Sequence, residues 1–116
     1  MSDLQRFVYR LCPPRSTFPD DMTPEEAVVM REHVAYWTDL LERGVAVVFG
    51  PVAEPTGTYG LAVVEVADAA HADRIRQNDP IVRAGLGPVD VYPMRAAVVR
   101  PLAAAPAATE GDASTA

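Results

Sequence analysis

His33 and Asp79 are the two residues of this 116-residue chain whose types and positions best suit catalysis. In a helix with about 100° per residue, His33 would lie about 40° from Trp37 and about 20° from Leu40, at the border of an apolar face. A histidine held there can act as a general base or acid near neutral pH, and a neighbouring carboxylate would fix its tautomer. The alternative is a structural histidine that bonds a backbone carbonyl.

Asp79 precedes Pro80, a place where aspartate often only organises a turn, whereas its functional interpretation is an orienting carboxylate or a second base. We interpret His71 and Cys12 as structural residues. No His-x-x-His or His-x-x-x-His spacing and no glycine-rich phosphate motif occurs, so the sequence predicts neither a metal nor a cofactor. All ten basic residues are arginine, which excludes Schiff-base chemistry on a lysine.

Charge and hydropathy restrict the partners. The net charge of -6 and the scattered arginines argue against nucleic acid. No run of about 20 apolar residues occurs, and the N-terminus lacks the layout of a signal peptide, so we expect a cytoplasmic protein without a membrane segment. Arg31 and Arg83 are either anchors for an anionic substrate or surface charges, and they stay outside the predicted site.

The elements that must position His33 and Asp79 follow from periodicity and end signals. Thr23-Pro24-Glu25-Glu26 is a capping box that begins a helix, and Gly44 ends it. The predicted elements are strands at 6–11, 45–49, 60–66 and 89–99, and helices at 24–43 and, after a cap at Asp68, up to Asn78. They form one domain over residues 1–100, followed by a disordered tail at 101–116.

This order predicts an α+β fold of the ferredoxin-like β-α-β-β-α-β plan, with two helices on one face of a four-stranded antiparallel sheet. The strand at 60–66 is apolar on both of its faces. The face without helices therefore needs a cover, and a second copy of the chain is the simplest one. We expect a homodimer.

Three segments together resemble the YCII-related (YciI-like) family over about Phe7 to Val98: Glu32-His33, Gly50-Pro51-Val52, and Asn78-Asp79-Pro80-Ile81-Val82-Arg83-Ala84-Gly85-Leu86. The resemblance implies a dimeric α+β barrel with a pocket in each chain, and active-site residues that match His33 and Asp79. One member type removes chloride from a chlorinated hydroxyquinol-like aromatic with that pair. A sister group has Asp-Gly-Pro-Phe where this chain has Gly50-Pro51-Val52, which argues against membership of that group.

Two functions remain open. In the first, a cofactor-free enzyme of the lyase, dehydrochlorinase or isomerase type transfers a proton through His33 on a cyclic or aromatic small molecule, and Asp79 orients the ring. Trp37 and Pro51 are then the candidate substrate-binding residues. In the second, a non-catalytic dimer binds a metabolite or a partner, and His33 and Asp79 only fix the helix against the Asp79 loop.

Overall fold

The computed structural model describes residues 3–101. The predicted order of strands and helices is present, with one short helix in addition. The predicted tail, apart from Pro101, lies outside the described residues. In chain order the elements are β1 (Gln5–Leu11), α1 (Pro24–Glu42), β2 (Ala46–Val52), β3 (Tyr59–Val66), α2 (Ala69–Asn78), α3 (Pro80–Arg83) and β4 (Val89–Pro93).

Helix α1 begins and ends where its local signals place it. The Thr23 hydroxyl accepts from the Glu26 N–H at 3.1 Å, and the Glu26 carboxylate accepts from the Thr23 N–H at 3.0 Å, so the predicted capping box is confirmed. Beyond the helix, Gly44 takes a φ of 77°, which glycine adopts without steric cost. The apolar face of α1 buries Trp37 and Leu40.

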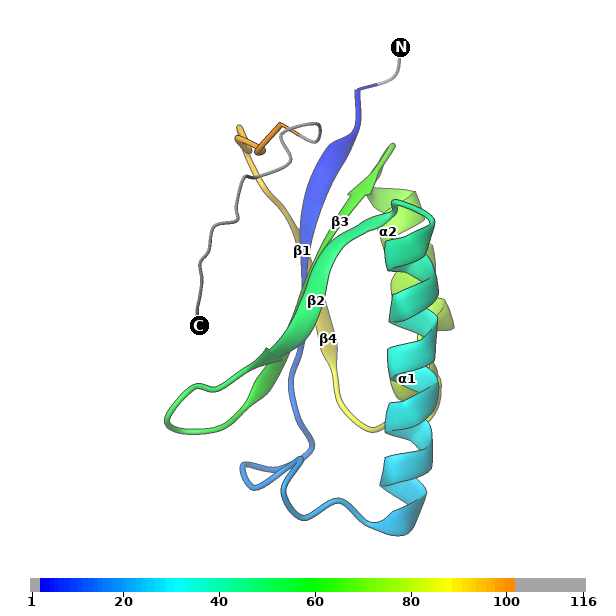
Figure 1. Ribbon diagram of the computed structural model, residues 1–116, viewed down its shortest axis with the longest axis vertical. Helices are drawn as coiled ribbons and strands as arrows, with labels where there is room; N and C mark the ends of the chain where they lie inside the picture. Colours follow the sequence, from blue (N-terminus) through cyan, green and yellow to red (C-terminus); the bar gives the residue numbers. More distant parts are fainter. Residues whose placement is uncertain (1–2, 102–116) are drawn as a thin grey trace, which may run out of the picture.

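The sheet has the strand order β2-β3-β1-β4, and every neighbouring pair is antiparallel. Helices α1 and α2 lie on one face of this sheet, and the other face has no helix over it (Figure 1). The core forms between the sheet and the two helices. Its buried members are Phe7, Tyr9, Trp37, Leu40, Ala46, Ala62, Val64, Val66, Ala72 and Ile75.

The face of the sheet without helices presents an apolar row that crosses all four strands. In register, Val48 of β2 pairs with Val63 of β3, Val63 with Val8 of β1, and Val8 with Tyr92 of β4. Val48 is 52% exposed and Tyr92 is 53% exposed. We call these four residues the open-face row.

The last strand is shorter than predicted. We expected it to reach Val99, but β4 ends at Pro93. The Met94 N–H donates to the Arg6 carbonyl, and the strand pattern is then interrupted by a turn at Ala96, whose φ is 50°. Strand β2, in contrast, extends beyond the predicted end at Phe49 and includes Pro51, which an edge strand tolerates.

Candidate functional site

Asp79 occupies the junction between two helices. The predicted end of α2 is confirmed, because the residue before a proline avoids helical geometry and Asp79 is extended. Asp79 also begins α3, which the sequence analysis missed: its carboxylate accepts from the Ile81 N–H at 3.0 Å, and Pro80 occupies the first turn. The signal was present, since aspartate followed by proline is a typical helix start.

The Asp79 carboxylate is fully buried and accepts four hydrogen bonds. Oδ1 accepts from the Ile81 N–H and lies 2.7 Å from His33 Nδ1. Oδ2 accepts from the Tyr9 hydroxyl at 2.6 Å and from the Trp37 indole N–H at 2.8 Å. A buried carboxylate is costly unless its oxygens are hydrogen-bonded, and here donors from β1, α1 and α3 meet that requirement.

These contacts set the charge of the cluster. Burial raises the pKa of the Asp79 carboxyl. The hydrogen bond and the charge of His33, together with the hydrogen bonds from Trp37 and Tyr9, have the larger and opposite effect, so the pKa lies below its usual value. Burial, followed by the charge of Asp79, raises the pKa of the Tyr9 hydroxyl far above its usual value. At neutral pH Asp79 is therefore a carboxylate and Tyr9 a hydroxyl donor.

The tautomer of the His33 ring follows from this charge. A carboxylate can only accept, so Nδ1 of His33 must bear a proton. In the neutral ring Nε2 then has no proton and is an acceptor. Within residues 3–101 Nε2 has no hydrogen-bond partner, and the His33 side chain, which is 13% exposed, lines a cavity. This is the arrangement of a general base.

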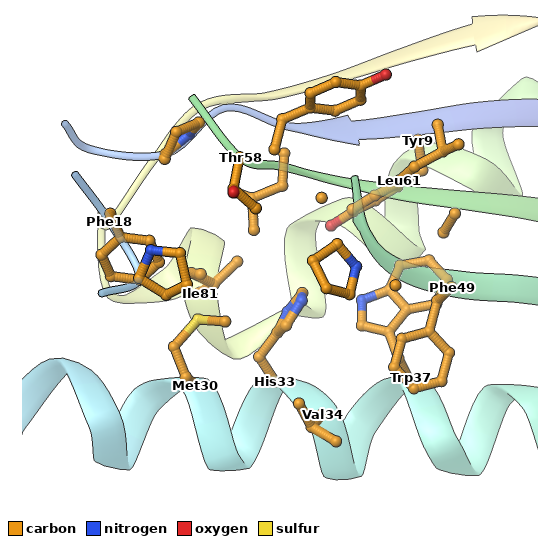
Figure 2. A pocket seen from close by; sticks show the side chains of 18 of the residues that line it. Tyr9, Phe18, Met30, His33, Val34, Trp37, Phe49, Thr58, Leu61 and Ile81 are labelled. Atoms are coloured by element: carbon orange, nitrogen blue, oxygen red, sulfur yellow. The ribbon is translucent and has the colours of Figure 1, made fainter. Parts of the chain in front are cut away.

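The cavity has a volume of about 210 Å³. It lies between α1, the sheet and the loop that joins β1 to α1, and in Figure 2 His33 rises from α1 between Met30 and Trp37. Within the described part of the chain, no arginine, aspartate or glutamate lines it. The lining residues are Tyr9, Leu11, Pro13, Pro14, Phe18, Pro19, Met30, His33, Val34, Trp37, Phe49, Gly50, Pro51, Thr58, Tyr59, Gly60, Leu61, Ala62 and Ile81.

The resemblance in the sequence also implies a pocket and a histidine and an aspartate that match His33 and Asp79. The model of the YCII-related domain matches residues 8–95, most of the described chain. The chain belongs to the YCII-related domain family. A search of curated proteins found no match. None of the helices among residues 3–101 has the length and apolar character to cross a membrane.

The structure of this YCII-related domain brings all four predicted site residues to one place. His33 and Asp79 are in contact, and Trp37 and Pro51 line the cavity. Trp37 has a second contact that we did not predict, because its indole N–H also donates to Asp79. No group of three or more His, Cys, Asp or Glu side chains within residues 3–101 could hold a metal ion.

Two residues of the site were missed. Tyr9 holds Asp79 from β1, and the signal was its place on the inward face of a strand, where a tyrosine hydroxyl needs a partner. Phe18 lines the cavity from the loop before α1. The signal there was a large apolar side chain within an otherwise polar loop. Arg31 and Arg83 do not line the cavity.

Proposed function

We propose that this YCII-related domain is a cofactor-free acid-base enzyme that transfers a proton on a small, uncharged cyclic or aromatic substrate. One observation supports the proposal above all others. The Nδ1 proton of His33 is directed to a buried carboxylate, which leaves Nε2 free toward an apolar cavity. General bases of this type contribute typically about 10²- to 10⁴-fold to a rate.

The reaction would proceed in two proton transfers. A substrate ring lies against Trp37 and Pro51 and directs an acidic C–H or O–H to Nε2 of His33. Nε2 takes the proton, and Asp79 stabilises the imidazolium that forms. In an isomerase, the imidazolium then returns the proton to a neighbouring carbon, and in a lyase to a departing oxygen as its bond to carbon breaks. In a dehydrochlorinase, the electron pair of the broken C–H bond forms a C=C bond, the C–Cl bond breaks and chloride leaves, and the imidazolium gives its proton to solvent. The apolar walls exclude water and strengthen the electrostatic interaction between the two residues.

The cavity indicates what kind of molecule fits. An engineered apolar cavity of about 150 Å³ holds benzene, so about 210 Å³ suits a single substituted ring. Among the described lining residues there is no guanidinium to bind a carboxylate or a phosphate. We therefore propose an uncharged substrate, in place of the anion that Arg31 or Arg83 would have anchored.

Proton transfer can be tested without knowing the natural substrate. Cyclohexanone and 2-tetralone have acidic ring C–H groups, so a general base in the cavity should exchange them for deuterium in D₂O, which proton NMR follows. We expect His33→Gln to slow the enzyme-dependent exchange by about 10²-fold or more. The matched control is His71→Gln, because His71 does not line the cavity and should leave the rate unchanged. Equal exchange rates in His33→Gln and the wild type would overturn the proposal.

A non-catalytic binding module is the second candidate. The observation that favours it is that Asp79 joins β1, α1 and α3 through its hydrogen bonds, which is also what a purely structural pair would do. Ligand binding can be followed by the fluorescence of Trp37, the single tryptophan of the chain. Binding of the two ketones without any deuterium exchange would favour this second function.

We also propose that the subunit has the ferredoxin-like plan and pairs into a dimeric α+β barrel through its open face. The support is the open-face row, in which Val48 and Tyr92 are exposed and Val8 and Val63 are partly exposed in a single chain. The same row on a second copy would be self-complementary across a twofold axis. Tyr92→Arg in the row should convert the dimer to a monomer in sedimentation velocity, whereas Val98→Arg, which is outside the sheet, should not. Equal masses for wild type and Tyr92→Arg would contradict this pairing.

A further inference from the structure

The loop between β1 and α1 places one large side chain inside the molecule. Most residues from Ser16 to Thr23 are exposed, but Phe18 is only 5% exposed and lines the cavity. In Figure 2 the labelled side chains follow the axis of α1, with His33 between Met30 and Phe18 on one side and Trp37 on the other. Phe18 therefore closes the end of the cavity toward the start of α1.

Arg15 holds this loop in place. Its guanidinium donates to both carboxylate oxygens of Glu26, at 3.0 and 2.7 Å, and to the Asp21 side chain at 3.0 Å. The same group lies 5.6 Å from the centre of the Phe18 ring, within the range of a cation-π contact. Glu26 is itself fixed by the capping box of α1, so the loop and the helix start form one connected unit.

The contact with Arg15 also changes the pKa of Glu26. The hydrogen bond from Arg15, together with that from the Thr23 N–H, lowers the pKa of the Glu26 carboxyl to about 2. A forked guanidinium contact of this type fixes geometry as well as charge. Phe18 is thus an end wall with a defined position, on a segment that is separate from the main core.

We infer that Phe18 is a specificity-determining residue, which sets the maximum length of the ligand measured from His33, and that Arg15 is the residue that positions it. This inference depends on the proposed function, because it assumes that the cavity receives the substrate. The ligand class that fits is an uncharged ring with one hydroxyl, which donates to Nε2 of His33, and one apolar substituent, which extends to Phe18.

A homologous series of 4-alkylphenols measures this length directly. Binding is followed by Trp37 fluorescence at a pH where the phenols are neutral. In the wild type, affinity should rise about fourfold with each added methylene until the chain meets Phe18, and then fall. In Phe18→Ala the optimum should move to chains longer by roughly two to three methylenes, since removal of the ring leaves space.

Two variants serve as controls. Phe49→Ala enlarges the cavity near Trp37, so it should leave the optimum length along the Phe18 direction unchanged. Arg15→Gln keeps the Phe18 ring but breaks the fork to Glu26, and should flatten the dependence of affinity on length. It tests the inference independently if Phe18→Ala does not fold.

The outcomes separate this inference from the function on which it depends. An optimum that is the same in the wild type, Phe18→Ala and Arg15→Gln would overturn the role of Phe18, while binding of the short phenols would still support an apolar-ligand site. A shift in Phe49→Ala in place of Phe18→Ala would overturn it as well, because the substituent would then extend to the opposite end. Absence of binding in every protein would overturn both proposals.

Discussion

On each side of the sheet a carboxylate lies beside hydrogen-bond donors, and the two carboxylates differ in burial. On the helix side Asp79 is fully buried and accepts from His33, Tyr9 and Trp37. On the open side Asp90 is paired with Arg10 at 3.0 Å, and both side chains are exposed. Solvent and salt weaken the exposed pair, whereas the buried group depends wholly on its donors.

Burial determines which of the two carboxylates can fix the orientation of its partner. An exposed ion pair exchanges its partners with water at little cost. A buried carboxylate with four donors keeps one orientation and imposes it on the His33 ring. The helix-side cluster therefore positions the His33 ring, whereas the open face has no helix over it.

The largest effect is expected for Asp79→Asn. The amide has the same shape but lacks the charge, and its N–H₂ group cannot accept from the donors that now surround the carboxylate. We expect a loss of about 3 kcal/mol in the free energy of unfolding, measured by urea denaturation. The matched control is Asp90→Asn in a chain made monomeric by Tyr92→Arg, where the pair with Arg10 is exposed and the effect should be much smaller. Equal losses for both variants would remove the distinction between the two faces.

The buried Asp79 carboxylate should also make the free energy of unfolding depend on pH. The pKa of Asp79 is lowered in the folded protein, so its contribution to stability is fully present above the unfolded value of about 3.9 and is lost as the pH falls through the folded value. The difference in unfolding free energy between wild type and Asp79→Asn should therefore shrink in acid. Urea denaturation at several pH values from about 6 to 2 measures it. A difference that stays constant across this range would contradict a charged Asp79.

A smaller effect is expected for Tyr9→Phe. This variant removes one donor to the carboxylate and keeps the ring that packs against Trp37 with centroids 4.7 Å apart. We expect a loss of about 1.5 kcal/mol in unfolding free energy, since Trp37 still donates to the same oxygen. Tyr92→Phe, a change on the open face, is the control. A neutral result for Tyr9→Phe would mean that the hydroxyl does not support Asp79.

The smallest effect is expected for Arg10→Gln. In a chain made monomeric by Tyr92→Arg, it breaks the exposed pair with Asp90, so stability in urea should change little, and any change should vanish in about 1 M salt. In the paired protein, where the proposed second copy covers the open face, the loss should be larger and should persist in salt. Equal effects in the two backgrounds would contradict the proposed pairing, and a large loss in the monomeric chain would contradict an exposed pair.

Most of the fold could be predicted because its signals are local. The capping box at Thr23, the glycine at 44, the alternation in β1 and the β-branched run in β3 each act within a few residues, and they mark the elements correctly. The end of β4 could not be found in the same way. Val98 and Val99 are β-favouring residues within the predicted strand, but β-propensity is context-dependent and the chain turns at Ala96 before it reaches them.

Part of the site could be predicted because it also depends on local signals. The sequence shows that His33 lies beside an apolar helix face and that Asp79 precedes a proline. Their contact joins residues 46 positions apart, and the support from Tyr9 spans 70 positions. Such pairings depend on the tertiary arrangement of β1, α1 and α3, so the sequence could name the candidates without the partners that orient them.

The proposed function requires that Asp79 holds the proton of the neutral His33 ring on Nδ1 and leaves Nε2 free toward the cavity. ¹⁵N NMR of ring-labelled histidine tests it directly, at a pH well above the ordinary histidine pKa of about 6.5. The chain has only two histidines, so His71→Gln assigns the signals. We expect a protonated Nδ1 and an unprotonated Nε2 in His33. A neutral ring with its proton on Nε2 would contradict it.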